Sequence, residues 1–359
     1  MCLRQWMLPV LFLSILLLLL LNTSVAMDGI QQALSLCTQT LIPSLFPFLV
    51  FSELLIAMGG GRLMGYALGR PVGKLFGLSR NAASAILLGS VCGQPIGTVS
   101  GVSLYNRGEI TKAELQRLTL FANNPSSGFL IGAVGIGLFQ NHTVGIALFC
   151  ITQLSAAIIG VSLHILLGPA ALAENIPYNG TGNRVSVQDI TQGVHRALSA
   201  MLQICAFVLF FSCIAACLSR LFGSLPLPHI VEIFIYGILE LTSGISRAVT
   251  SLPPSIAFRI AACFAGFSGL SVCLQIFSVA REEAPSLLSY LLTKGSQGCV
   301  SLLLAECYLR VFDPPLTPSA SVVAPVWAQV SYAPVFMCCF LMCLFYFLQK
   351  KRQTPQGIC

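Results

Sequence analysis

Residues 83–104, ASAILLGSVCGQPIGTVSGVSL, form an apolar run long enough to enter a bilayer, with a break at Gly93, Gln94 and Pro95. Glycine and proline free backbone N–H and C=O groups that hydrocarbon cannot satisfy. Such a break therefore persists only where protein or a water-filled cavity surrounds it. Similar breaks follow at Asn123-Asn124-Pro125-Ser126-Ser127-Gly128 and at Gly266-Phe267-Ser268-Gly269. The pattern predicts a helical membrane protein whose broken segments lie in its interior.

The composition agrees with a membrane protein. Apolar residues make up 56% of the 359 residues and charged residues only 9%, whereas a soluble domain carries about a quarter charged residues. Each span needs roughly 20 apolar residues, so the length allows about eight to ten spans plus short loops. If two of the runs are re-entrant hairpins, about eight spans remain. The predicted fold class is an all-α polytopic membrane protein with two pseudo-repeated halves.

Other classes of function find little support. The net charge of +7 comes from Lys and Arg spread thinly between apolar runs, so no nucleic acid partner is expected. The 15 cysteines include no C-x-x-C pair and no Cys/His cluster, which predicts neither a metal nor a cofactor. Gly266 to Gly269 matches the Gly-x-Ser-Gly of intramembrane serine proteases. All four histidines precede Ser268, however, so the serine lacks the later base that an enzyme needs.

The distribution of positive charge predicts the topology. If the runs 83–104 and 257–280 are re-entrant hairpins with tips at Pro95 and Gly269, every Lys and Arg except Arg220 and Arg310 falls on one side. Positive charge collects on the cytoplasmic side, so both termini of this multi-pass cell-membrane protein are expected in the cytoplasm. The expected parts are a membrane helix at 1–27, a first half at 28–168, a cytoplasmic loop at 169–196, a second half at 197–348 and a basic tail at 349–359. Residues 1–26 also resemble a cleavable signal peptide, which is the alternative to an uncleaved first helix.

A weak internal repeat points to transport. Residues 41–52 are echoed by residues 201–212, and a broken run follows each of them, at 89–101 and at 265–276. Paired broken segments in corresponding positions indicate the binding site of a transporter. Inverted repeats would place the two hairpins on opposite sides of the membrane, whereas the charges place both inside. This conflict stays open.

The breaks and the intramembrane acids supply candidate site residues. A helix that restarts after a break offers free N–H groups and the positive end of its dipole to an anion. The candidate solute-binding residues around the breaks are Gln94, Thr98, Asn123, Asn124, Ser126, Ser127, Ser268, Ser271 and Gln275. Glu240 and Glu53 are candidates for binding a coupling ion or proton, with less weight on Glu306, because a charge within the membrane is costly. The alternative is that these small and polar residues only pack and hydrogen-bond neighbouring helices.

The residues at 41–48, Leu41-Ile42-Pro43-Ser44-Leu45-Phe46-Pro47-Phe48, are followed by Ser52-Glu53-Leu54-Leu55. This pattern resembles the N-terminal signature of the YlbJ (SpoVV) family of sporulation integral membrane proteins. The order of the later breaks and the segment Leu239 to Ile245 fit the same family, so the resemblance covers nearly the whole chain. It implies a nucleoside-recognition Gate domain and an arrangement with re-entrant hairpins, similar to that of concentrative nucleoside transporters.

The resemblance also implies a function. It suggests a role in endospore formation, in which dipicolinate leaves the mother cell across the outer forespore membrane. The family has Gly-Tyr-Pro-Ala-Gly with a lysine soon after it, where this chain has Gly93 to Gly97 and no nearby lysine. If that lysine helps to hold an anion, the solute of this chain differs.

The leading interpretation is a transporter of a small anionic solute such as dipicolinate, with a nucleoside-like solute as an alternative. The rival interpretation is a membrane scaffold that recruits other sporulation proteins and uses its loops, above all the loop from Asn175 to Gln192. Assembly of several copies into a homo-oligomer is left open.

Overall fold

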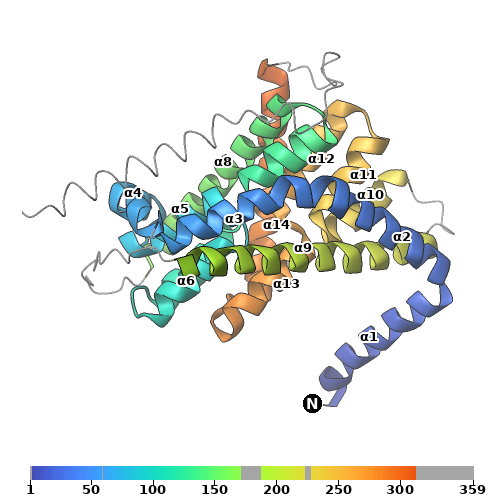
Figure 1. Ribbon diagram of the computed structural model, residues 1–359, viewed down its shortest axis with the longest axis horizontal. Helices are drawn as coiled ribbons and strands as arrows, with labels where there is room; N and C mark the ends of the chain where they lie inside the picture. The colour runs from blue at the N-terminus through green and yellow to red at the C-terminus, as the bar shows by residue number, and fades with distance from the viewer. Residues whose placement is uncertain (1, 59, 171–186, 223–227, 313–359) are drawn as a thin grey trace, which may run out of the picture. The chain divides into compact units, whose positions relative to one another are not determined.

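The computed structural model describes residues 2–58, 60–170, 187–222 and 228–312 (Figure 1). Every regular element in these ranges is a helix, in agreement with the predicted all-α class. The first ten elements are α1 (Cys2–Leu21), α2 (Thr23–Leu36), the π-helical turn η1 (Cys37–Leu41), α3 (Ile42–Ala57), α4 (Gly60–Phe76), α5 (Arg80–Cys92), α6 (Ile96–Asn106), α7 (Lys112–Phe121), the π-helical segment η2 (Gly128–Leu138) and α8 (His142–Leu167). They are followed by α9 (Val187–Phe222), α10 (His229–Leu239), α11 (Leu241–Ser251), α12 (Pro254–Phe267), α13 (Gly269–Ala280), the 3₁₀ turn η3 (Arg281–Glu283) and α14 (Leu287–Phe312).

Several helical stretches can cross a membrane. Among the described residues, Thr23–Leu55, His142–Leu167, Ile190–Arg220 and Pro254–Glu283 are long and apolar enough. The pair Leu63–Phe76 and Arg80–Cys92, bent by 100°, adds a fifth span if it counts as one. The predicted apolar run at 325–348 and the tail at 349–359 lie outside the described residues, so the count of about eight spans stays a prediction.

The first predicted hairpin tip is a turn between two packed helices. α5 ends at Cys92, α6 begins at Ile96, and the two helices pack against each other. Gly93 has a φ of 84°, a conformation that favours glycine. A Cβ atom on Gly93 would lie 2.5 Å from Cβ of Ser126. Glycine is therefore needed both for the turn and for its contact with the break after α7.

The second predicted hairpin, with its tip at Gly269, is wrong. α12 and α13 follow each other along the single stretch Pro254–Glu283, which Ser268 only interrupts. The folded helix pair of the second half is instead α10 and α11, which meet at Glu240 and pack against each other. Gly and Ser show that a helix is interrupted, but contacts with other helices decide whether the chain continues or turns.

Capping interactions fix several of the helix ends. The hydroxyl of Thr111 and the carboxylate of Glu114 form a capping box at the start of α7. Glu114 also accepts a hydrogen bond at 2.7 Å from the backbone N–H of Ser79, which precedes α5. The buried acid Glu114 therefore joins the starts of α5 and α7, and its role is structural.

The core connects the two parts of the chain. The largest buried apolar cluster contains Leu45 of α3, Leu130 of η2 and Leu148 of α8, together with Val208 of α9 and Phe258 of α12. α9 begins at Val187, so the end of the predicted loop at 169–196 is helical. α9 packs along α2 and α3, which brings the second part of the chain against the first.

Candidate solute-binding site

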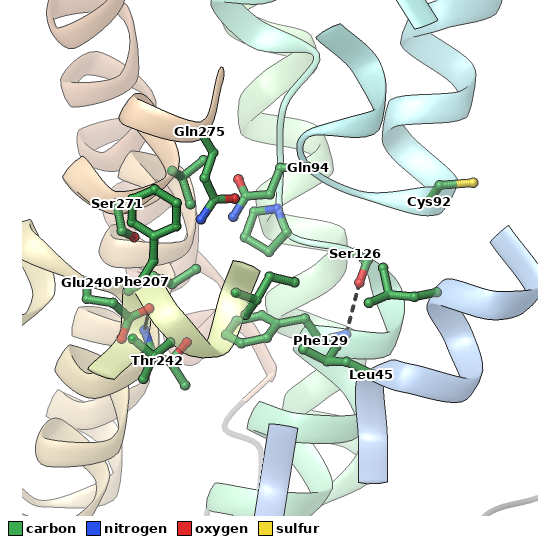
Figure 2. A pocket seen from close by; sticks show the side chains of 16 residues that line it. Leu45, Cys92, Gln94, Ser126, Phe129, Phe207, Glu240, Thr242, Ser271 and Gln275 are labelled. Carbon is green, nitrogen blue, oxygen red and sulfur yellow. Dashed lines mark hydrogen bonds between the residues drawn. The ribbon is translucent and has the colours of Figure 1, made fainter. Parts of the chain in front are cut away.

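A cavity of about 60 Å³ lies where two helix turns and two helix interruptions meet (Figure 2). Gln94 comes from the turn between α5 and α6, and Ser126 comes from the interruption between α7 and η2. Glu240 comes from the turn between α10 and α11, while Ser271 and Gln275 belong to α13 just after the interruption at Ser268. The structure thus brings five of the predicted site residues together in one place.

Apolar side chains form the rest of the cavity wall. They include Leu45 of α3, Phe129 of η2 and Phe207 of α9. An apolar wall with a few convergent polar groups is typical of small-molecule sites, but such sites usually measure about 300–1,000 Å³. A cavity of about 60 Å³ is far smaller, so a solute with an aromatic ring fits only after the surrounding helices separate.

Four helices begin beside this cavity, namely α6, η2, α11 and α13. Helix starts carry unpaired N–H groups and partial positive charge, which favour an anion. The start of α11 is already occupied, because the carboxylate of Glu240 accepts hydrogen bonds from the N–H groups of Thr242 (2.9 Å) and Ser243 (2.6 Å). The protein therefore places its own carboxylate at one of the four anion-binding ends.

The polar side chains of the cavity are mostly uncharged. Glu240 is the one charged residue among the described residues that line it, and no Lys or Arg is among them. The side-chain amides of Gln94 and Gln275 point toward one another (Figure 2). Oε1 of Gln94 is buried and accepts no hydrogen bond from the described part of the chain. This oxygen can accept a hydrogen bond from an N–H or O–H group of a solute.

Other predicted residues lie behind the cavity and shape it. Oδ1 of Asn123 accepts a hydrogen bond from the N–H of Thr98 at 3.1 Å, and Nδ2 of Asn123 donates to Oγ1 of Thr98 at 2.7 Å. The backbone oxygen of Asn124 accepts from the N–H of Gln94 at 2.8 Å. Ser268 is fully buried and donates to the backbone oxygen of Ala265. The residues that do not line the cavity are therefore Thr98, Asn123, Asn124, Ser268 and the half-buried Ser127.

Two of the predicted acids have partners elsewhere. Glu53 forms an ion pair with Arg196 at 3.0 Å. Glu306 forms ion pairs with Arg259 and with Arg310. Neither acid lines the cavity, so Glu240 is the predicted coupling residue that the structure brings to the site.

Sequence reasoning missed Lys294, which the charge distribution assigned to the cytoplasmic side. Its side chain is buried in α14, with 1% exposed. Nζ donates to the backbone oxygen of Asn123 (3.0 Å), to Oδ1 of Asn124 (3.3 Å) and to Oε1 of Gln297 (2.8 Å). A signal was available, because one face of α14 repeats buried residues at helical spacing, namely Tyr290, Lys294, Gln297, Ser301 and Ala305.

Comparison with known proteins finds one similar sporulation protein. The chain is 24% identical over 331 residues to the sporulation integral membrane protein YlbJ of Bacillus subtilis (strain 168), which covers 80% of this chain and 79% of that protein. This similarity supports the resemblance to the YlbJ family. No family model and no solved structure matches it. The expected similarity of the chain to YlbJ is thus confirmed, whereas the Gate domain stays a prediction.

Proposed function

We propose that this member of the YlbJ family is a membrane transporter that carries a small anionic solute during sporulation, with dipicolinate as the favoured solute. The observation that supports this most is the cavity beside which four helices begin. Helix starts bind carboxylates without a charged side chain. Dipicolinate carries two carboxylates on an aromatic ring, and the ring would contact Phe129 and Phe207 in the apolar wall.

The order of elements supports transport. A long helix, a folded helix pair, an interrupted helix and a second long helix occur in this order as α3, α5–α6, α7–η2 and α8, with α4 as an extra helix after α3. The same order recurs as α9, α10–α11, α12–α13 and α14. We infer that these are two repeated halves around one site, as in many transporters. This alignment pairs the turn at Gly93 to Pro95 with Glu240, and the break at Asn123 to Ser127 with Ser268. The sequence-based alignment instead paired residues 89–101 with residues 265–276, and we propose the new alignment in its place.

Glu240 is the proposed coupling residue. An anion that binds the N–H groups of Thr242 and Ser243 must displace the carboxylate that now accepts from them. Protonation of Glu240 removes the competing charge and makes this exchange easier. Solute entry and proton uptake would therefore favour each other, which couples the two movements.

Transport is tested with purified protein in liposomes. We expect time-dependent uptake of labelled dipicolinate above that of empty liposomes, and competition by unlabelled dipicolinate. In cells, spores of a strain without the gene should contain much less dipicolinate than spores of its parent. A normal dipicolinate content in such spores would contradict the dipicolinate assignment.

A nucleoside-like solute is the second candidate. The facing amides of Gln94 and Gln275, with no Lys or Arg in the wall, suit the paired donors and acceptors of a nucleobase. Competition separates the two candidates in the same liposomes. If uridine or adenosine blocks dipicolinate uptake at equal concentration, a nucleoside is the better candidate solute. If neither has an effect, the anion is favoured.

A further inference from the structure

A second polar cluster surrounds the Nζ atom of Lys294, behind the cavity. α14 carries this buried lysine into the interruption between α7 and η2, where it contacts Asn123 and Asn124. The third contact is to Gln297, one helical turn further along α14. A charged side chain within the apolar part of a membrane protein is costly, so its presence calls for a specific role.

The cluster matches a cation in number and kind of ligand. An ammonium group has three N–H donors and no acceptor, and Lys294 meets three oxygen atoms, one of them a backbone carbonyl. Further bonds hold these oxygens in place. Nε2 of Gln297 donates to Oδ1 of Asn124 at 2.7 Å, and Nδ2 of Asn124 donates to the backbone oxygen of Phe121 at 2.8 Å.

Neutral groups compensate the charge of Lys294. α12, α8 and α7 pack against α14, and the acids within these helices and α14 are occupied elsewhere. Glu306 pairs with Arg259, and Glu114 accepts from the N–H groups of Ser79 and Thr111. In the described part of the chain, the hydrogen-bond acceptors of Lys294 are therefore oxygen dipoles alone. Unwound backbone carbonyls of this kind coordinate Na⁺ in other transporters with broken helices.

We propose that the ε-ammonium of Lys294 is a tethered cation that fills a monovalent-cation site in the interruption between α7 and η2. A free Na⁺ is then not needed at this position. The effect of Lys294 on transport rests on the proposed function. The occupation of the site by the ammonium group of Lys294 does not.

The tethered cation acts on the cavity through the backbone. Asn124 accepts from Lys294 with its side chain and from the N–H of Gln94 with its backbone oxygen. Gln94, Pro125 and Ser126 line the cavity. Lys294 is therefore a positioning residue, because it holds the interruption in the shape that presents these groups to the solute.

Two substitutions at position 294 test the proposal in liposomes. Lys294→Ala removes the ammonium and leaves space, whereas Lys294→Met removes the charge but keeps most of the volume. Wild-type dipicolinate uptake should be equal in sodium and in choline buffers at constant pH. In choline buffer, Lys294→Ala should lose uptake by at least about tenfold, because several hydrogen bonds to a charged group are lost. Methylammonium or Na⁺ should restore much of that uptake in Lys294→Ala and none in Lys294→Met.

Several results would overturn the proposal. Lys294→Met with wild-type uptake would show that an uncharged side chain suffices, and a strict need of the wild type for Na⁺ would place the cation elsewhere. Failure of methylammonium and Na⁺ to restore Lys294→Ala would show that no cation site exists.

A binding measurement separates this proposal from the proposed function. If wild-type liposomes move neither dipicolinate nor a nucleoside, the transport function fails, and thermal unfolding of the detergent-purified variants decides on Lys294. Methylammonium should then raise the unfolding temperature of Lys294→Ala by a few degrees. It should leave the wild type and Lys294→Met unchanged. No selective rise for Lys294→Ala, or no folded Lys294→Ala even when it is purified with methylammonium, overturns the tethered cation.

Discussion

At the residue scale, the interruption between α12 and α13 places a serine in a left-handed backbone conformation. Ser268 has a φ of 73° and is completely buried. A residue with a Cβ atom pays about 1–2 kcal/mol in this conformation. We expect Ser268→Gly to raise the free energy of unfolding by about 0.5–1 kcal/mol, because glycine relieves the strain but gains freedom in the unfolded chain. Thermal unfolding in detergent measures the change. Ser268→Ala is the control that keeps the strain, and a glycine variant less stable than the alanine variant would contradict the prediction.

The side chain of Gln275 supplies a second prediction at the residue scale. It lines the cavity opposite Gln94. Gln275→Leu keeps a similar volume but removes the amide, so kcat/KM for uptake should fall by about 5–30-fold, equivalent to about 1–2 kcal/mol for a lost hydrogen bond. The concentration dependence of uptake in liposomes measures it. Thr293→Val, at a half-buried position of α14 that does not line the cavity, should leave uptake unchanged, and equal effects of the two variants would argue against the site.

At the element scale, the contact between the α5–α6 turn and the break after α7 depends on Gly93. Gly93 and Gly108 both have positive φ, 84° and 70°, but a Cβ on Gly108 would meet nothing within 4 Å. Both alanine variants lose about 1–3 kcal/mol through backbone strain. Gly93→Ala should lose about 1–3 kcal/mol more, because its Cβ would press on Ser126. Unfolding temperatures of the two variants show the difference, and equal losses would mean that the contact with Ser126 is not tight.

The start of α11 gives a second prediction at the element scale. Glu240 caps this helix with both carboxylate oxygens. Glu240→Gln keeps one amide oxygen for the cap and removes the negative charge that competes with an anion. Uptake of dipicolinate by the wild type should increase as the pH falls, while uptake by Glu240→Gln should change little with pH. A pH profile of initial uptake rates checks this, and identical profiles would exclude Glu240 as the coupling residue.

At the scale of the whole molecule, contacts between α7 and the segment of η3 and Ala284 join distant parts of the sequence. Nζ of Lys112 lies 2.6 Å from a carboxylate oxygen of Glu283, and Gln116 donates to the backbone oxygen of Ala284. The hydrogen bond to Glu283 raises the pKa of Lys112, so its ammonium group is charged at neutral pH. The proposed transport of a solute with a ring requires that elements around the cavity separate, because the cavity is too small for a ring. We expect this contact to open in that step.

Crosslinking tests whether this contact opens. Cysteines at positions 112 and 283, joined by a short bifunctional reagent, should stop uptake, and a reducible reagent should allow recovery after reduction. The exposed Cys150, Cys299 and Cys307 are first replaced by serine. A cysteine pair at positions 107 and 109, whose native side chains form an ion pair within one loop, is the matched control. Full uptake with the 112–283 crosslink would show that this contact stays closed during transport.

Local signals in the sequence predicted the parts of the site that depend on local structure. Gly93, Pro95 and Pro125 mark interruptions by their effect on the backbone alone, and the polar residues beside them, such as Gln94 and Ser126, were found in this way. Contacts between distant segments were not predictable in this way. The direction of the chain after Ser268 depends on packing between helices. Lys294 lies inside the molecule because α14 begins at Leu287, seven residues before it. Local signals did not place the start of this helix.

The bonds from Lys294 to the oxygen of Asn123 and from Gln94 to the oxygen of Asn124 end on the main chain. Main-chain oxygens are present whatever amino acid occupies a position, so these links survive side-chain replacement during evolution. At 24% identity to the Bacillus subtilis protein, most side chains have had the opportunity to change. A search for the same architecture in remote sequences should therefore look for an interrupted helix followed, in a long helix that corresponds to α14, by a basic residue on its buried face. The asparagine pair itself is a poorer marker.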